Sequence, residues 1–335
     1  MTHEFKEILE AYLKAKQLSK STVLATLVSV NGSSYRKEGV RMLIHQNMQI
    51  VGAVSGGCVE KEVVLQSQSV FATGQSKLIS YDGRYRLGCE GTLYLLLEKL
   101  NISDEVILKI QHCFANRKSF QLNTFYADAL TVGGGTIVQL DGVDYPISNF
   151  NRKTKFKNCF HQIMEPIFQI YIVGTEHDAN SLSQQASFLG WEVIIVNGTK
   201  TLKSINDFIG TKKIINTEED DINELKIDRE TAIVLMNHNY AKDLWFLQRL
   251  KKSKPLYIGL LGATKRKEQL FTALIEDDLD ISEEFLELIH GPTGLDIGSV
   301  TPQEIAVSIV AEIIATKKNK LVSSLPKNTS LKLSI

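Results

Sequence analysis

The sequence predicts a two-domain α/β protein, in which an N-terminal mixed α/β domain is followed by a C-terminal domain with a mainly parallel sheet. The length of 335 residues suits two domains of roughly 100–200 residues each. Before about residue 140, strand-like and helical segments follow one another without a regular order. Beyond residue 168 they alternate, which is typical of parallel β–α–β units and of a Rossmann-like domain.

The first domain is expected over residues 1–140. Its first helix is predicted by apolar residues that recur every three or four positions, and its first strand by a β-branched run that suits burial on both faces. Gly74 is expected to end the helix that precedes it. Helices are predicted near 3–18, 59–72 and 103–115, and strands near 22–30, 40–46, 48–54, 77–81, 92–98, 119–126 and 136–140.

Residues 141–167 are polar and aperiodic, so we expect a linker there. The second domain is expected over 168–318, followed by a tail at 319–335. Its last helix begins after Thr301, where Glu304 completes a capping box. Strands are predicted at 168–173, 192–196, 213–215, 231–236 and 256–261, and helices near 178–189, 240–251 and 302–316.

Composition argues against several classes of protein. Lys+Arg and Asp+Glu are equal at 38 each, which gives no sign of a nucleic-acid partner. No signal peptide and no apolar run of roughly 20 residues is seen, so we expect a cytoplasmic protein without a membrane partner. The four cysteines are far apart and form no Cys-x-x-Cys pair, which argues against a disulfide framework or a structural zinc site. A homodimer is expected only because dimers are common.

The segment Ser55-Gly56-Gly57-Cys58 lies between a predicted strand and a predicted helix. Two glycines allow backbone N–H groups to approach a ligand closely, and a helix N-terminus favours an anion. A thiol in that position has a lowered pKa and suits a nucleophile, a sulfur carrier or a metal ligand. The alternative is a tight turn with a buried cysteine.

A second cysteine stands between glycines in Leu87-Gly88-Cys89-Glu90-Gly91. This segment fits a backbone packed closely on a ligand, or a bulged entry into a strand. The segment 31–41 adds hydroxyl and guanidinium groups, which bind phosphate or a polar ring edge unless the turn is merely solvated. Its candidate binding residues are Ser33, Ser34, Tyr35, Arg36 and Arg41.

Three turns of the second domain follow predicted strands or precede helices. The first places Gly174 and His177 where a dinucleotide fingerprint would lie, but Glu176 replaces its middle glycine, and its side chain would repel a pyrophosphate. Asn197 stands where a ribose-binding acid is expected, so NAD(P) binding is not favoured. The other two turns predict phosphate contacts or packed structural loops. Their candidate residues are Gly262, Lys265 and Arg266 in one turn, and Gly294 and Asp296 in the other.

Together these motifs resemble the XdhC/CoxI family of maturation factors for molybdenum hydroxylases, which include xanthine dehydrogenase and carbon monoxide dehydrogenase. The resemblance extends over nearly the whole chain. It is carried by the segments 25–41, 52–60, 87–91, 258–266 and 291–315.

The resemblance implies a chaperone that binds molybdenum cofactor as cargo, supports its sulfuration with a cysteine desulfurase, and delivers it to an apo molybdenum hydroxylase. Cys58 and Cys89 match the family's cysteine positions and are assigned to the cofactor or to the sulfur. A binding protein is therefore favoured over an enzyme with its own turnover. Glu90, Glu176 and Asn197 depart from the family pattern. The alternatives are an NAD(P)-dependent oxidoreductase and an interaction scaffold with purely structural glycine loops.

Overall fold

The structure is a computed structural model, and it describes residues 1–57, 59–82, 91–127, 133–150, 156–197, 203–216, 225–237, 239–278 and 281–322. The chain divides into two compact units, Met1–Ile167 and Phe168–Ile335. Each unit contains its own buried core, and the second is a Rossmann domain with a parallel sheet, as the sequence predicts.

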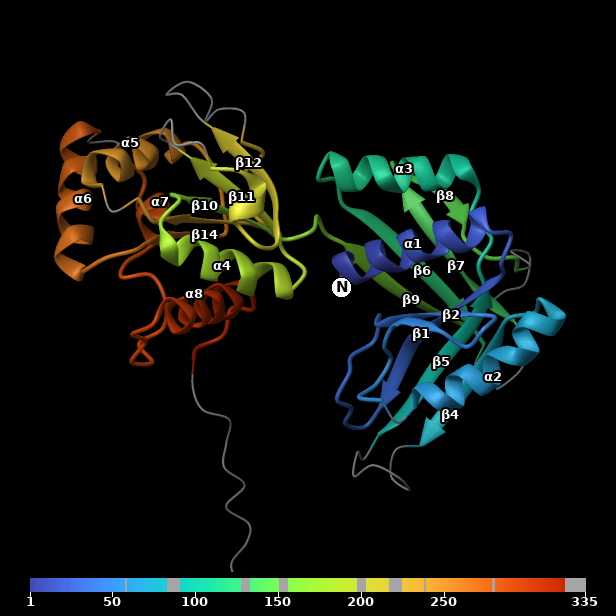
Figure 1. Ribbon diagram of the computed structural model, residues 1–335. Helices are drawn as coiled ribbons and strands as arrows, with labels where there is room; N and C mark the ends of the chain where they lie inside the picture. Colours follow the sequence, from blue (N-terminus) through green and yellow to red (C-terminus); the bar gives the residue numbers. More distant parts are fainter. Residues whose placement is uncertain are drawn as a thin grey trace, which may run out of the picture. The chain divides into compact units, whose positions relative to one another are not determined.

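The first unit contains a five-stranded and a four-stranded antiparallel sheet, in the orders β3-β2-β1-β5-β4 and β8-β7-β6-β9 (Figure 1). The strands of the first sheet are β1 (Thr22–Asn31), β2 (Arg41–His45), β3 (Ile50–Gly52), β4 (Lys77–Asp82) and β5 (Thr92–Lys99). Those of the second are β6 (Phe120–Tyr126), β7 (Gly134–Leu140), β8 (Val143–Pro146) and β9 (Asn158–Met164). The helices are α1 (Thr2–Gln17), α2 (Glu60–Thr73) and α3 (Asp104–Ala115).

Strand β1 is buried on both faces, which explains its unbroken apolar run. Val23, Ala25 and Leu27 belong to the core that also includes Val63 and Val70 of α2. Leu24, on the other face, packs in the core that includes residues of α1, α3 and the second sheet. The end of α2 also agrees with the sequence-based prediction, because Gly74 follows this helix with φ +70°.

The stretch 141–167 is not the linker that the sequence predicts. It contributes β8 and β9 to the four-stranded sheet, and β9 pairs with β6 from Phe120 to Tyr126. Both are edge strands with several exposed or half-exposed side chains, so they lack the apolar pattern that would identify them.

The second unit has a six-stranded parallel sheet in the order β12-β11-β10-β13-β14-β15. Its strands are β10 (Gln169–Val173), β11 (Glu192–Asn197), β12 (Thr211–Asn216), β13 (Thr231–Leu235), β14 (Tyr257–Leu260) and β15 (Ile289–His290). Its helices are α4 (His177–Phe188), the 3-10 helix η2 (Ile205–Asp207), α5 (Tyr240–Leu250), α6 (Thr264–Asp277), α7 (Glu283–Glu287) and α8 (Pro302–Lys317).

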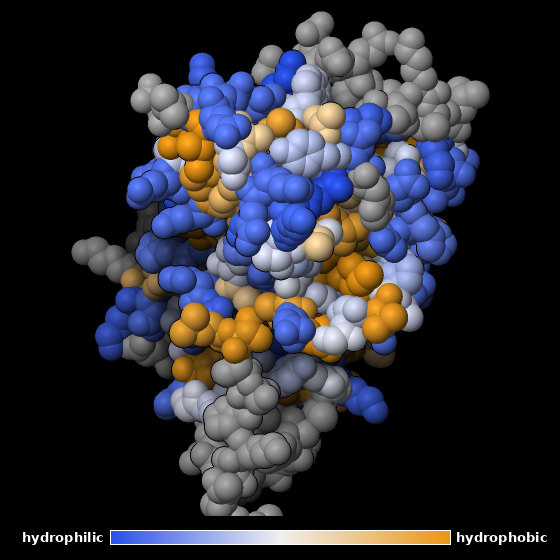
Figure 2. Space-filling model, turned by 90° about the vertical axis from the view of Figure 1, so that its left-hand side faces the viewer, coloured by the Kyte–Doolittle hydropathy of each residue, from blue (hydrophilic) through white to orange (hydrophobic). Residues whose placement is uncertain are grey.

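Two cores cover the two faces of this sheet, one with α4 and α8 and the other with α5, α6 and α7. Thr301 caps α8 in the predicted capping box, where it accepts from the N–H of Glu304. On the face shown in Figure 2, hydrophilic side chains alternate with several groups of hydrophobic ones. Among the described residues, no helix is long and apolar enough to cross a membrane.

Candidate functional site

The first three motifs of the sequence meet at one end of the five-stranded sheet. The chain leaves β1, β3 and β4 toward this end and enters β2 and β5 from it, because neighbouring strands are antiparallel (Figure 1). The described residues of the connections there are 32–40, 53–57, 59 and 91. We call this the motif end of the sheet. Segments up to about 60 residues apart in sequence thus share one edge.

The loop that follows β3 is held in place by hydrogen bonds to the carboxylate of Glu60. Glu60, only 6% exposed, accepts from the backbone N–H of Ser55 at 2.7 Å and from its hydroxyl at 2.6 Å. The Ser55 Oγ also accepts from the N–H groups of Gly57 and Val59, at 3.2 and 3.3 Å. Val54 and Val59 are buried on either side. Hydrogen bonds through Ser55 and Glu60 therefore fix the conformation of this loop, which we call the pinned turn.

Burial would raise the pKa of Glu60, but the hydrogen bonds from Ser55 and from nearby backbone groups lower it overall. The carboxylate is therefore charged at neutral pH. Sequence reasoning missed Glu60 because it lies five residues after Ser55, which does not fit the three-residue spacing of a capping box.

The two glycines of this loop face open space. A Cβ atom built on Gly56 or on Gly57 would meet no atom of another described part of the chain within 4 Å. Gly57 has φ +117°, which disfavours any other residue, whereas Gly56 has no such requirement. Packing against the described residues therefore gives no reason for a glycine at position 56. Cys58 and Cys89 both lie outside the described residues.

The segment 31–36 lies at the same motif end. A Cβ on Gly91 would be 2.3 Å from the Ser33 carbonyl oxygen, so the last residue of the 87–91 segment packs directly on Ser33. Ser34 accepts from the N–H of Arg36 at 3.2 Å, and Tyr35 is 80% exposed. The Nε of Arg36 is buried and has no partner among the described residues. This segment therefore presents a donor that suits an anionic group.

Arg41, predicted alongside these residues, does not join them. It is 6% exposed, and its guanidinium donates to the Gly39 carbonyl at 2.9 Å and to the Gln162 side chain. Burial lowers the pKa of Arg41 to about 10, although the nearby Glu98 acts in the other direction. Glu98 is itself fully buried, and burial raises its pKa. Both residues are buried in the first unit, and its contacts with Gly39 and Gln162 make Arg41 a structural residue.

In the second unit, the predicted residues follow the carboxyl ends of the parallel strands. Gly174 comes after β10, with φ +129°, and a Cβ there would lie 2.8 Å from the Met236 carbonyl oxygen. Gly262 follows β14, and Gly294 follows β15. His177, Lys265 and Asp296 are exposed. The carboxyl edge is where open parallel sheets bind ligands.

Arg266, by contrast, is already paired with a carboxylate of a neighbouring helix. It forms an ion pair with Asp243 of α5 at 2.7 Å, and Asp243 is only 1% exposed. Asn237 donates to the same carboxylate at 3.2 Å. The sequence did not reveal Asp243, because the two residues are 23 positions apart. Arg266 is therefore less free to hold a phosphate than the sequence suggests.

The loop around Gly294 is built on Glu312 of α8. Its carboxylate accepts from the Tyr257 hydroxyl at 2.5 Å, from the Gly294 N–H at 2.7 Å and from His290 Nδ1 at 3.1 Å. Burial would raise the pKa of Glu312, but these hydrogen bonds lower it overall. Burial and the charge of Glu312 raise the pKa of Tyr257. Sequence reasoning identified this loop but not the carboxylate beneath it.

No group of three or more His, Cys, Asp or Glu side chains within the described ranges could hold a metal ion. The structure thus defines a two-unit protein with a glycine-loop edge on an antiparallel first unit and a Rossmann domain as its second. Residues 16–82 match the family described as "XdhC and CoxI family", and residues 170–313 match the "XdhC Rossmann domain". The chain belongs to the XdhC/CoxI family.

Three relatives extend over most of the chain. It is 28% identical to a probable xanthine dehydrogenase subunit of Bacillus subtilis, over 95% of this chain and 99% of the relative. It is 24% identical to "Molybdenum cofactor insertion chaperone PaoD" of Escherichia coli, over 95% and 90%. A crystal structure described as a xanthine dehydrogenase from Bacillus halodurans matches with a TM-score of 0.78 and 25% identity, over 95% of this chain and 98% of that one.

Proposed function

We propose that this protein is a maturation factor that binds molybdenum cofactor as cargo at the motif end of its first unit. It supports sulfuration of the cofactor, for which a cysteine desulfurase supplies the sulfur, and it delivers the cofactor to an apo molybdenum hydroxylase such as xanthine dehydrogenase. The name of the Escherichia coli relative supports the cargo, and family membership supports the maturation role.

One observation carries this proposal more than any other. Glu60 accepts two hydrogen bonds from Ser55 and holds the Ser55–Gly57 turn, while a Cβ on either glycine would contact no other described part of the chain. A rigid backbone without side chains is suited to a bulky planar ligand that must approach closely. It also immediately precedes Cys58, whose thiolate would be a soft ligand or sulfur contact for molybdenum.

The charge at the motif end fits the same cargo. The pterin of the cofactor carries a phosphate or a nucleotide diphosphate, and such groups need donors. The Nε of Arg36 is a buried donor without a partner among the described residues, and Ser33 and Ser34 lie beside it. These residues would hold the phosphate, while the glycine turn would receive the ring system.

An NAD(P)-dependent oxidoreductase is less well supported. Glu176 stands at the N-cap of α4, where a pyrophosphate would approach the helix. A carboxylate in that place repels an anion. Tight NAD(P)H binding in a titration would support this alternative and count against a cargo protein.

The test is to purify the protein from a host that makes the cofactor and to measure bound pterin after oxidation to its fluorescent form. Gly56→Ala adds one methyl group in open space without backbone strain, so we expect pterin loss with an unchanged melting temperature. Gly142→Ala is the matched control, because Gly142 has φ +79° and an equally open surrounding in the β7–β8 turn. It should lose stability and keep pterin.

The cysteines are tested by activation of the apo hydroxylase. Cys58→Ala and Cys89→Ala should each reduce activation in a mixture of protein, cofactor and desulfurase. Absence of pterin from the wild type, both as purified and after reconstitution, would refute the cargo role. Unchanged activation by both cysteine variants would mean that the glycine loops are only structural.

A further inference from the structure

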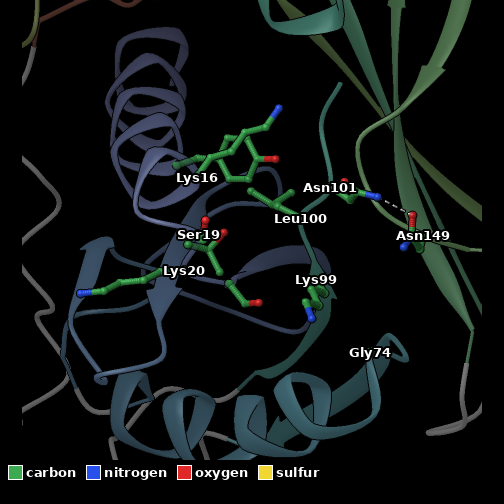
Figure 3. A pocket seen from close by; sticks show the side chains of 11 residues that line it. Lys16, Ser19, Lys20, Gly74, Lys99, Leu100, Asn101 and Asn149 are labelled. Carbon is green, nitrogen blue, oxygen red and sulfur yellow. Dashed lines mark hydrogen bonds between the residues drawn. The ribbon is translucent and has the colours of Figure 1, made fainter. Parts of the chain in front are cut away.

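A second feature of the first unit lies at the opposite end of the five-stranded sheet from the motif end. A hollow of about 410 Å³ opens where α1 ends, β1 begins and β5 ends (Figure 3). Its volume is in the range of small-molecule sites. It is lined by Tyr12, Lys16, Ser19, Lys20, Ser21, Thr22, Gly74, Lys99, Leu100, Asn101 and Asn149.

The described residues of the lining include three lysines and no carboxylate. Lys16 is held by Asp104 at 2.6 Å and by the Ile102 carbonyl at 2.8 Å. The ammonium groups of Lys20 and Lys99 make no hydrogen bond or ion pair with another described residue. Figure 3 shows them on different walls, with Lys20 extending away from Lys99. Lysine side chains are flexible, so both ammonium groups can turn toward a bound anion.

The hydroxyl groups provide an independent observation. Thr22 is 1% exposed, and its Oγ1 has no hydrogen-bond partner among the described residues, although it lines the hollow. A buried hydroxyl without a partner is costly unless a ligand completes it. Ser19 follows α1 with φ +54°, a conformation that favours glycine. Serine at this position keeps a hydroxyl at the hollow despite the backbone cost.

The lysines have another explanation, which the hydroxyls do not share. Both α1 and α2 end near the hollow, and basic side chains offset the partial negative charge of helix C-termini. That effect would explain Lys16 and Lys20. It does not explain why the hydroxyl of Thr22, which lines the hollow, has no partner among the described residues.

We infer that this hollow, which both Lys99 and Thr22 line, binds a small phosphorylated molecule. A phosphate group carries close to two negative charges at neutral pH and offers several acceptor oxygens, which match ammonium, hydroxyl and amide donors. Asn101 donates to Asn149 at 3.0 Å, so the amide of Asn149 keeps its own donors for a ligand. The site is separate from the proposed cargo end of the same sheet.

The experiment is calorimetric titration of the full-length protein with inorganic pyrophosphate at fixed ionic strength. Thr22→Val removes the hydroxyl while keeping the shape of the side chain. We expect about tenfold weaker binding, because a hydrogen bond to a charged group is lost, together with an equal or higher melting temperature. Lys99→Gln should weaken binding by at least about tenfold for the same reason.

The matched control is Thr26→Val. Thr26 lies on the same strand, is fully buried and also has a hydroxyl without a partner among the described residues, but it does not line the hollow. It should leave pyrophosphate affinity unchanged. Ser19→Gly is a second test variant. Glycine adopts the positive φ of this position without strain, so this substitution should weaken binding without loss of stability.

Three outcomes would overturn the inference. The first is no saturable binding by the wild type. The second is equal binding by Thr22→Val, Lys99→Gln and Thr26→Val, which would place the anion elsewhere. The third is citrate binding as tight as pyrophosphate binding, which would make the site one for carboxylates. Pterin content reports separately on the cargo proposal, because Lys99→Gln should not alter it.

Discussion

Replacement of Glu60 tests the construction of the motif end most directly. Glu60→Ala removes the acceptor of two short hydrogen bonds, at 2.7 Å from the Ser55 N–H and at 2.6 Å from its hydroxyl. Hydrogen bonds to a charged group contribute roughly 1.5–3 kcal/mol each. Allowing for partial replacement by water at the loop surface, we expect the first unit to lose about 3 kcal/mol. For a domain of this size, that lowers the melting temperature by roughly 6–12 °C.

A double-mutant cycle separates the shared bonds from unrelated effects. Ser55→Ala removes the hydroxyl bond to Glu60 and the Oγ acceptor of Gly57 and Val59. Because the two single variants lose one bond in common, the double variant should be more stable than their sum predicts by about 1–2 kcal/mol.

The assay uses urea unfolding followed by circular dichroism. The chain has two tryptophans, Trp191 and Trp245, and both lie in the second unit, so tryptophan fluorescence is an internal control that should not change. A loss below about 1 kcal/mol for Glu60→Ala, or strict additivity in the cycle, would refute the pinned turn.

The pH dependence gives an independent check. The pKa of Glu60 is lower in the folded protein than in the unfolded chain, where it is about 4.3. The charged carboxylate therefore stabilises the fold fully above the unfolded-state pKa. This stabilisation is lost as the pH falls through the lower pKa of the folded state. The difference in unfolding free energy between wild type and Glu60→Gln should therefore be constant from about pH 7 to about pH 5.5 and shrink below it. A difference that grows on acidification would contradict the sign of the shift.

Three further predictions concern buried groups. Glu98→Ala leaves the Thr136 N–H and the hydroxyl groups of Thr136 and Ser148 without their buried acceptor, so the first unit should lose about 3 kcal/mol in urea unfolding. Glu312→Ala leaves three donors without their acceptor, so tryptophan fluorescence should report a loss of about 3 kcal/mol in the second unit alone. Gly174→Ala forces a methyl group to 2.8 Å from the Met236 carbonyl at φ +129°, and the same fluorescence transition should fall by about 2 kcal/mol or more, whereas an unchanged midpoint would contradict the close packing.

Much of the fold follows from local patterns. The apolar spacing of α1 and the capping box at Thr301 predict helices that the structure confirms, because both depend on residues within one or two turns. The alternation beyond residue 168 likewise predicts the parallel sheet. The failure at 141–167 has the opposite origin, since β8 and β9 are edge strands identified only by their partners β7 and β6.

The sequence by itself determined the family, the α/β fold class with its Rossmann-like second domain, and the glycine-rich segment Ser55–Cys58. Only the tertiary structure decided that three separate segments share the motif end, because antiparallel register depends on hydrogen bonds between distant strands. It also decided which charged residues are structural. In the sequence, nothing distinguishes Glu60 and Arg41 from other charged residues. Their burial and their hydrogen-bond partners result from tertiary packing.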